Sequence, residues 1–310
     1  MLSAGYSHLA VAAKKPANTD IAYMLTASSK GDLATVKAML ASGASANTKD
    51  ADGITALMYA ARKDNAAVAS ALIESGADLN AKDKGGWTAL MFAAKKNHVA
   101  TVKVLLDKGA DAKVRDTGGW SALGLAASSG YSETVDLIIK HGIDANTKGD
   151  DGRTVLMFAA KNGDVATVAS LINNGANLDI RDKLGTTAMM IAAREGHVEV
   201  VNFLLEKGAD VDEQDDSKWT ALTWAVKKSQ LAVAKALLDK GANVNHQDSE
   251  GTALLQLAVD TDSPEMVALL LERKADVKAR DQYGLTAYVY ALKKQNAEIV
   301  SLIKNAGGKY

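Results

Sequence analysis

The residue types that usually carry catalysis or bind metals are scarce or poorly spaced in this chain. It has no cysteine, and its five histidines, at positions 8, 98, 141, 197 and 246, form no His-Glu-x-x-His pattern. The acidic pair Asp150-Asp151 lacks the alternating ligands and final Glu of a calcium loop. The pair Gly85-Gly86 lies in a connector and not between a strand and a helix, as a phosphate-binding loop would require. We therefore expect no catalytic residue, no cofactor, no metal site and no enzymatic activity.

One group of side chains has the chemistry to bind a partner. Three of the four tryptophans and one arginine occupy equivalent positions of a regular repeat: Trp87, Trp120, Arg153 and Trp219. Tryptophan buries a large apolar area and keeps one hydrogen-bond donor, so it is enriched in binding hot spots. The alternative is that each indole packs on a neighbouring connector and serves stability alone.

A second group is basic. Ten of sixteen equivalent positions are Lys or Arg, whereas 36 such residues in 310 would place about two there by chance. These positions end short helices, where cations complement the helix dipole by about 0.3–1 kcal/mol. A row of cations also sums to a potential that attracts an acidic partner, and both effects can act together. The candidate binding residues of this group are Arg62, Lys63, Lys95, Lys96, Lys161, Arg194, Lys227 and Lys228.

Glycine recurs at a constant interval and defines the elements that must position these side chains. It stands at 43, 76, 109, 142, 175, 208 and 241, is replaced at 274, and returns at 307. In the third unit, Thr88 is a good N-cap for a short helix up to Lys96, and Asn97 suits a left-handed end. A second helix carries an apolar stripe at 102, 105 and 106, and Gly109 closes it. Helices this short need burial against neighbouring units to be stable.

Two segments of these units resemble the ankyrin repeat signature: Thr55-Ala56-Leu57-Met58-Tyr59-Ala60-Ala61 and Gly208-Ala209-Asp210-Val211-Asp212. Ala replaces the usual Pro of this signature, and Met often replaces its His. The resemblance covers residues 20–308 as nine repeats, with 20–49 and 281–308 as caps. It implies an all-α solenoid of stacked helix-turn-helix units joined by hairpin-like connectors. It also implies that His98 and His197 bond connector backbone.

The same resemblance implies where a partner would bind. The tryptophan positions would lie near the connector tips that line the concave side, and the basic positions would face the same groove. The chain is therefore expected to be a monomeric scaffold for a protein or an acidic peptide. Binding of a polyanion or nucleic acid by the basic groove is the alternative, and a net charge of −1 with a pI near 6.5 counts against it.

Residues 1–19 are expected to form either a helical cap or the remnant of a secretory signal. The stretch 9–15 is similar to the end of such a signal, but no basic region precedes it. No apolar run approaches the 18 or so residues of a membrane span. The absence of cysteine suits an oxidising compartment, so cytoplasmic, periplasmic and secreted locations all stay open. The composition would suit a bacterial protein.

The eighth unit departs from the pattern. Ala253 replaces the Thr cap and Lys274 replaces the helix-ending Gly, while Ser263-Pro264 restores a good start to the second helix. Each replacement is expected to cost about 1 kcal/mol. Units eight and nine are therefore predicted to open first.

Overall fold

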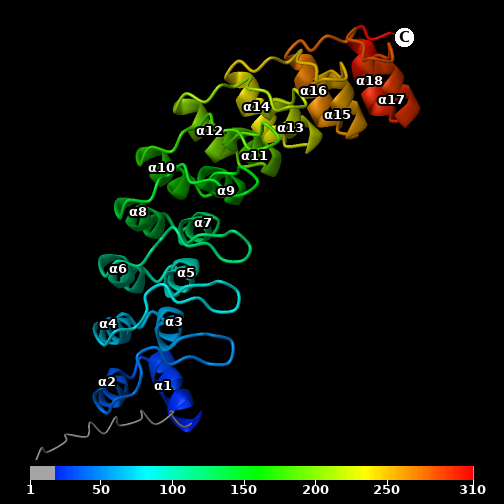
Figure 1. The fold of residues 1–310 in the computed structure, drawn as a ribbon. Coiled ribbons are helices and arrows are strands. Elements are labelled where there is room, and N and C mark those ends of the chain that lie inside the picture. The colour runs from blue at the N-terminus through cyan, green and yellow to red at the C-terminus, as the bar shows by residue number, and fades with distance from the viewer. Residues whose placement is uncertain (1–17, 310) are drawn as a thin grey trace, which may run out of the picture. The chain divides into compact units, whose positions relative to one another are not determined.

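The computed structural model describes residues 18–309, and this part of the chain folds as pairs of short helices (Figure 1). The first helices of the pairs are α1 (Asn18–Lys30), α3 (Ala56–Ala61), α5 (Ala89–Lys95), α7 (Ala122–Ala127), α9 (Val155–Asn162), α11 (Ala188–Glu195), α13 (Ala221–Lys227), α15 (Leu254–Asp260) and α17 (Ala287–Lys294). The second helices are α2 (Leu33–Ala41), α4 (Ala66–Glu74), α6 (Val99–Asp107), α8 (Ser132–Lys140), α10 (Val165–Asn173), α12 (Val198–Glu206), α14 (Leu231–Asp239), α16 (Pro264–Glu272) and α18 (Ala297–Asn305). The expected all-α repeat architecture is confirmed. The expected N-terminal segment 1–19 falls almost entirely outside the described residues.

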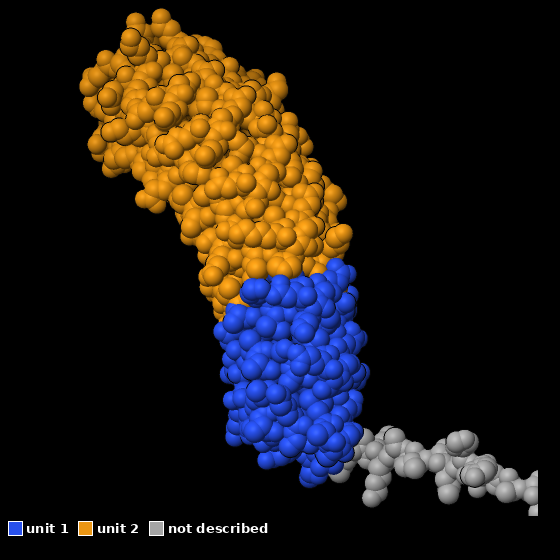
Figure 2. All heavy atoms as spheres, turned by 90° about the vertical axis from the view of Figure 1, so that its left-hand side faces the viewer, with its two compact units in different colours: residues 1–93, 100–111 blue, residues 94–99, 112–310 orange. Residues whose placement is uncertain are grey.

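The chain divides into two compact units, residues 1–93 with 100–111 and residues 94–99 with 112–310 (Figure 2). The boundary passes through the third repeat. In the larger unit, first helices contact the first helices of the next repeat, as α7 contacts α9, and second helices contact second helices, as α8 contacts α10. In the smaller unit, α1 contacts α3 and α2 contacts α4 in the same way. Each unit therefore has two parallel rows of helices.

Local chemistry accounts for where the helices begin and end. The hydroxyl of Thr55 accepts a hydrogen bond from the N–H of Met58 at 3.2 Å, which satisfies a free amide of the first turn. Asn97 has a φ of 57° and Gly109 a φ of 90°, the left-handed conformations predicted for these two helix ends. The connectors between repeats contain three isolated bridges, such as Lys49 with Thr55, and no named strand occurs between residues 18 and 309.

The core lies between the two rows of helices. Met58, Met91, Met157 and Met190 occupy equivalent positions of four first helices, and each is 1% exposed, so this methionine column packs in the interior. On the second helices from α4 to α16 the first two residues of the apolar stripe are buried, as Val135 and Ile138 are, and the third is often half-buried. The aromatic residues that follow the methionine column are half-buried: Tyr59, Phe92, Phe158, Trp224 and Tyr290.

Polar bonds fix the register of successive repeats. The Nε2 of His197 lies 2.9 Å from the carbonyl oxygen of Lys161, in the last turn of the first helix of the preceding repeat. The expected backbone bond of this histidine therefore exists, but its acceptor lies on helix α9 and not in a connector. A second link joins the hydroxyl of Thr134 to Oδ1 of Asn97 at 2.7 Å. The link is missing at Thr167, because the residue equivalent to Asn97 is Gly130 there.

The eighth repeat replaces its missing cap by another contact. Ala253 makes no side-chain hydrogen bond to the amides of the first turn. The buried amide of Gln256 accepts from the N–H of Ala253 at 2.7 Å and donates to the carbonyl of Leu285 at 2.7 Å. Lys274 adopts a φ of 65°, in the region where the equivalent glycines lie. The irregular backbone is thus as predicted, and Gln256 ties the eighth repeat to the ninth.

Candidate partner-binding surface

An aspartate in each connector positions the tryptophans. Oδ1 of Asp83 accepts hydrogen bonds from the amides of Gly85 and Trp87, both at 2.8 Å. Asp116 holds the amide of Trp120 at 2.8 Å, and Asp215 holds that of Trp219 at 2.9 Å. Asp commonly forms such turns because its short carboxylate reaches the backbone two residues ahead. The indoles therefore start from the same backbone geometry in all three repeats.

Each of these indoles packs on another aromatic ring and is half-buried. Within the smaller unit the ring centroids of Trp87 and Phe92 are 4.9 Å apart. Within the larger unit Trp219 lies 4.7 Å from Trp224 of its own repeat. Trp120 is different, because its partner is Phe158 of the next repeat, at 4.7 Å. Packing thus accounts for part of each indole, while the exposed part stays available to a partner.

Some half-buried aromatics also bond the connector aspartate of their own repeat. The hydroxyl of Tyr290 donates to Oδ2 of Asp281 at 2.5 Å, and this hydrogen bond, with a smaller effect of burial, raises the pKa of Tyr290 to about 12. Burial acts to raise the pKa of Asp281, but hydrogen bonds from Tyr290 and from backbone amides lower it overall. The indole of Trp224 donates to Asp215 at 3.1 Å. The constant spacing from Asp to aromatic was the sequence signal for these bonds.

Cations of the basic group lie over the same aromatics. The guanidinium of Arg62 is 5.2 Å from the ring centroid of Phe92, and that of Arg194 is 5.4 Å from the ring of Trp224. Such contacts stabilise by about 0.5–1 kcal/mol at exposed sites. The structure thus joins the aromatic and basic groups, which the sequence had presented as separate, into a single surface within each unit.

The basic group is less uniform than its sequence indicated. The chain's own acids neutralise two of its members, because Arg194 pairs with Glu195 at 2.9 Å and Lys227 with Asp260 at 3.2 Å. Arg153, at one of the tryptophan positions, lies 3.4 Å from Asp182 through its Nε. Burial acts to raise the pKa of Asp260, but hydrogen bonds from Lys227 and Lys294 lower it overall. Within residues 18–309, no ion pair involves the remaining predicted cations: Arg62, Lys63, Lys95, Lys96, Lys161 and Lys228.

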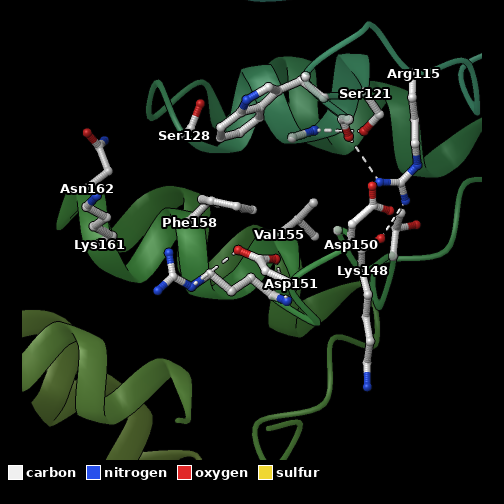
Figure 3. Close-up of a pocket in the computed structure, with 17 residues that line it drawn as sticks. Arg115, Ser121, Ser128, Lys148, Asp150, Asp151, Val155, Phe158, Lys161 and Asn162 are labelled. Carbon is white, nitrogen blue, oxygen red and sulfur yellow. Dashed lines mark hydrogen bonds and ion pairs between the residues drawn. The ribbon is translucent and has the colours of Figure 1, made fainter. Parts of the chain in front are cut away.

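Three of the predicted residues meet at a pocket in the larger unit, between the fourth and fifth repeats of the chain. Trp120, Arg153 and Lys161 line it, and its volume is about 630 Å³. Figure 3 shows Ser128 and Lys161 at one end of the pocket and Arg115 at the other, with Phe158 between them. This pocket was not predicted from the sequence, although the small residues at 124 and 128 were a usable signal.

No group of three or more His, Asp or Glu side chains could hold a metal ion in the part of the chain that the structure describes. Among residues 18–309 there is also no helix with the length and apolar character needed to cross a membrane.

The paired helices and their connectors define a repeat protein, and comparison with known proteins shows which class. Family models described as ankyrin repeats (3 copies) match residues 23–116, 109–182 and 156–248, and one described as ankyrin repeats (many copies) matches 237–291. The chain therefore belongs to the ankyrin repeat family. Ankyrin repeats generally mediate protein–protein interactions and are typically non-catalytic, and no enzyme domain was found here.

A solved structure agrees with this fold. The crystal structure of the human ASB11 ankyrin repeat domain is similar at a TM-score of 0.66 and 23% sequence identity, over 72% of this chain and 100% of that one. No curated protein matches the chain.

Proposed function

We propose that this protein binds an extended, acidic segment of a partner protein. The binding residues would be the half-exposed tryptophans and the cations at the ends of the first helices. The observation that supports this is the repeated combination of a half-buried aromatic with an adjacent cation, as Arg62 over Phe92 and Arg194 over Trp224. Aromatic residues and arginine are the types enriched in binding hot spots.

Charge supports an acidic partner more than a nucleic acid. Lys95 and Lys96 are exposed and in no ion pair with another described residue, so they can steer an acidic segment. Some cations of later repeats are already neutralised, as Arg194 is by Glu195 and Lys227 is by Asp260, so the row of positive charge is interrupted. A long polyanion needs an unbroken row of positive charge, whereas a short acidic segment needs only a few such residues.

The test compares charge reversals in two places. The full chain, the double variant Lys95→Glu with Lys96→Glu, and a control double variant Lys235→Glu with Lys240→Glu are each used to capture proteins from a cell extract. The control changes the same charge at exposed positions of the second helix α14 and its end. The captured protein is then purified, and its association rate with each form is measured at several salt concentrations.

Charge reversal at Lys95 and Lys96 is expected to slow association about tenfold and to weaken its salt dependence. The reason is that exposed charges at the rim of an interface change mainly the association rate. The control variant should behave as the unchanged chain. Equal association rates for both doubles would contradict the proposal. Tighter, steeply salt-dependent binding of heparin or duplex DNA would favour the polyanion alternative instead.

A further inference from the structure

The pocket of about 630 Å³ exists because the fourth repeat has lost two side chains that other repeats keep. At the position of Gly124, on helix α7, four other repeats have methionine: Met58, Met91, Met157 and Met190. At the position of Ser128, six repeats have Lys or Arg: Arg62, Lys95, Lys161, Arg194, Lys227 and Lys293. A Cβ added at Gly124 would lie 3.3 Å from Cε3 of Trp120, closer than ordinary packing allows. The missing side chain therefore lets the indole lie against α7 and leaves space beside it.

The lining has an apolar part and a cationic part. Trp120, Val155 and Phe158 supply the apolar surface, and Lys161 is exposed at one end of the pocket, in no ion pair within residues 18–309. Arg153 contacts Asp182 and Asp151 through Nε alone, at 3.4 and 3.6 Å. Its two Nη atoms have no partner among the described residues. A guanidinium with both Nη groups available can bind a carboxylate through two parallel hydrogen bonds.

Arg115 does not contribute to such binding, because it is already engaged at the other end of the pocket. Its Nη1 donates to the carbonyl of Gly119 at 3.0 Å, and its Nη2 donates to that of Lys148. Asp150 and Asp151 also line the pocket and would repel a carboxylate. Lys148 lines the same end as Arg115 (Figure 3), so the attractive positions for an acid near Phe158 are Arg153 and Lys161.

We propose that this pocket binds an aromatic side chain of a partner protein together with an acidic residue next to it in the partner's sequence. The ring would contact Trp120 and Phe158, and the carboxylate would bind Arg153 and Lys161. A volume of about 630 Å³ lies in the range of ligand sites and holds more than one side chain, as a peptide segment requires. This inference rests on the proposed function and names the pocket in which the acidic segment is anchored.

The experiment uses the full chain with 5-fluorotryptophan in place of its four tryptophans and records ¹⁹F spectra. The signal of Trp120 is assigned with Trp120→Phe. Three short peptides are titrated: acetyl-Asp-Glu-Phe-Glu-Asp-amide, the same peptide with Ala for Phe, and the same peptide with Lys for every acid. We expect the first to shift the Trp120 signal and to bind at least about tenfold tighter than the other two, because it alone offers both the ring and the acids.

Variants separate the pocket from the rest of the surface. Gly124→Met fills the space with the residue that other repeats carry. We expect this variant to bind the first peptide about tenfold or more weakly than the unchanged chain does. Thr223→Met places the same residue at the equivalent position of the seventh repeat, away from the pocket, and should leave binding unchanged. A fourth peptide carries Asn and Gln at the acidic positions of the first, and Arg153→Gln should reduce the preference for the first peptide over this fourth one by about fivefold or more. This ratio cancels any general effect of the variant on stability.

Failure of the pocket and failure of the proposed function give different results. If the first peptide leaves the Trp120 signal unmoved at about 1 mM, the pocket assignment is wrong. It is also wrong if the Gly124→Met variant and the unchanged chain bind this peptide with equal affinity. The proposed function then still stands if reversal at Lys95 and Lys96 slows association of the captured protein. Equal binding of the lysine peptide would also overturn the pocket assignment.

Discussion

Replacing Thr167 by Val should stabilise this protein, although the same change at the equivalent threonines should destabilise it. Thr101, Thr134 and Thr167 occupy one position of the second helix in successive repeats, and all three are fully buried. The hydroxyl of Thr101 bonds Oδ1 of Asp64 at 2.9 Å, and that of Thr134 bonds Oδ1 of Asn97 at 2.7 Å. The hydroxyl of Thr167 has no hydrogen-bond partner among the described residues, since Gly130 has no side chain to accept it.

The magnitudes follow from this difference. A buried polar group without a partner costs about 1–3 kcal/mol, whereas a satisfied hydrogen bond stabilises by about 0.5–1.5 kcal/mol. Valine has nearly the shape of threonine and a similar helix propensity. Thr167→Val should therefore raise the free energy of unfolding by about 1 kcal/mol. Thr134→Val should lower it by about 1 kcal/mol, because the hydrogen bond to Asn97 is lost.

The assay is urea unfolding of the full chain followed by circular dichroism, with hydrogen exchange of the α8 and α10 amides to locate the change. The slope of the transition must be equal in all variants, so that a shift of the midpoint reports stability. If Thr167→Val destabilises the chain as much as Thr134→Val does, the hydroxyl of Thr167 has a partner and the reasoning is wrong. In a Gly130→Asn background, which supplies the missing acceptor, Thr167→Val should become destabilising.

Two further predictions concern the last two repeats. Tyr290 should titrate with a pKa of about 12, and Tyr290→Phe should remove that step from an absorbance titration. Folding raises the pKa of Tyr290 from its ordinary 10, so the hydrogen bond to Asp281 contributes stability that is complete below pH 10 and lost as the pH rises through 12. An unchanged titration of the Tyr290→Phe variant would contradict this. Lys274→Gly should stabilise the chain by about 0.5–1 kcal/mol, because glycine adopts a positive φ without strain. Amide exchange in repeats eight and nine should slow accordingly, and unchanged exchange would show that Lys274 is not the cause of their weakness.

Much of the fold was predictable because it depends on local chemistry repeated at a constant interval. The local features are the Thr caps, the left-handed conformations of Asn97 and Gly109, and the hydrogen bonds that Asp83 accepts from nearby amides. Each depends only on residues at most a few positions apart. Such effects can be read from one repeat and then apply to the others. The packing of the methionine column followed from the same periodicity.

The candidate site was only partly predictable, because its contacts join different repeats. The sequence indicated Trp120, Arg153 and Lys161 as candidates but gave no reason to place them at one pocket. Trp120 packs on Phe158 of the next repeat, and Arg153 reaches Asp182 in the connector that follows its own repeat. Side-chain rotamers decide such contacts, and the period does not determine them. The pairing of Lys227 with Asp260 went unforeseen for the same reason.

By itself, the sequence determined the repeat, its helices and the positions that are free to vary, since backbone propensities and apolar spacing act within each unit. Only the tertiary structure decided which of those positions are neutralised, which pack on an aromatic ring, and which border an open pocket. The physical reason is that these properties depend on the space between adjacent repeats. At the fourth repeat, two small residues, Gly124 and Ser128, leave that space open.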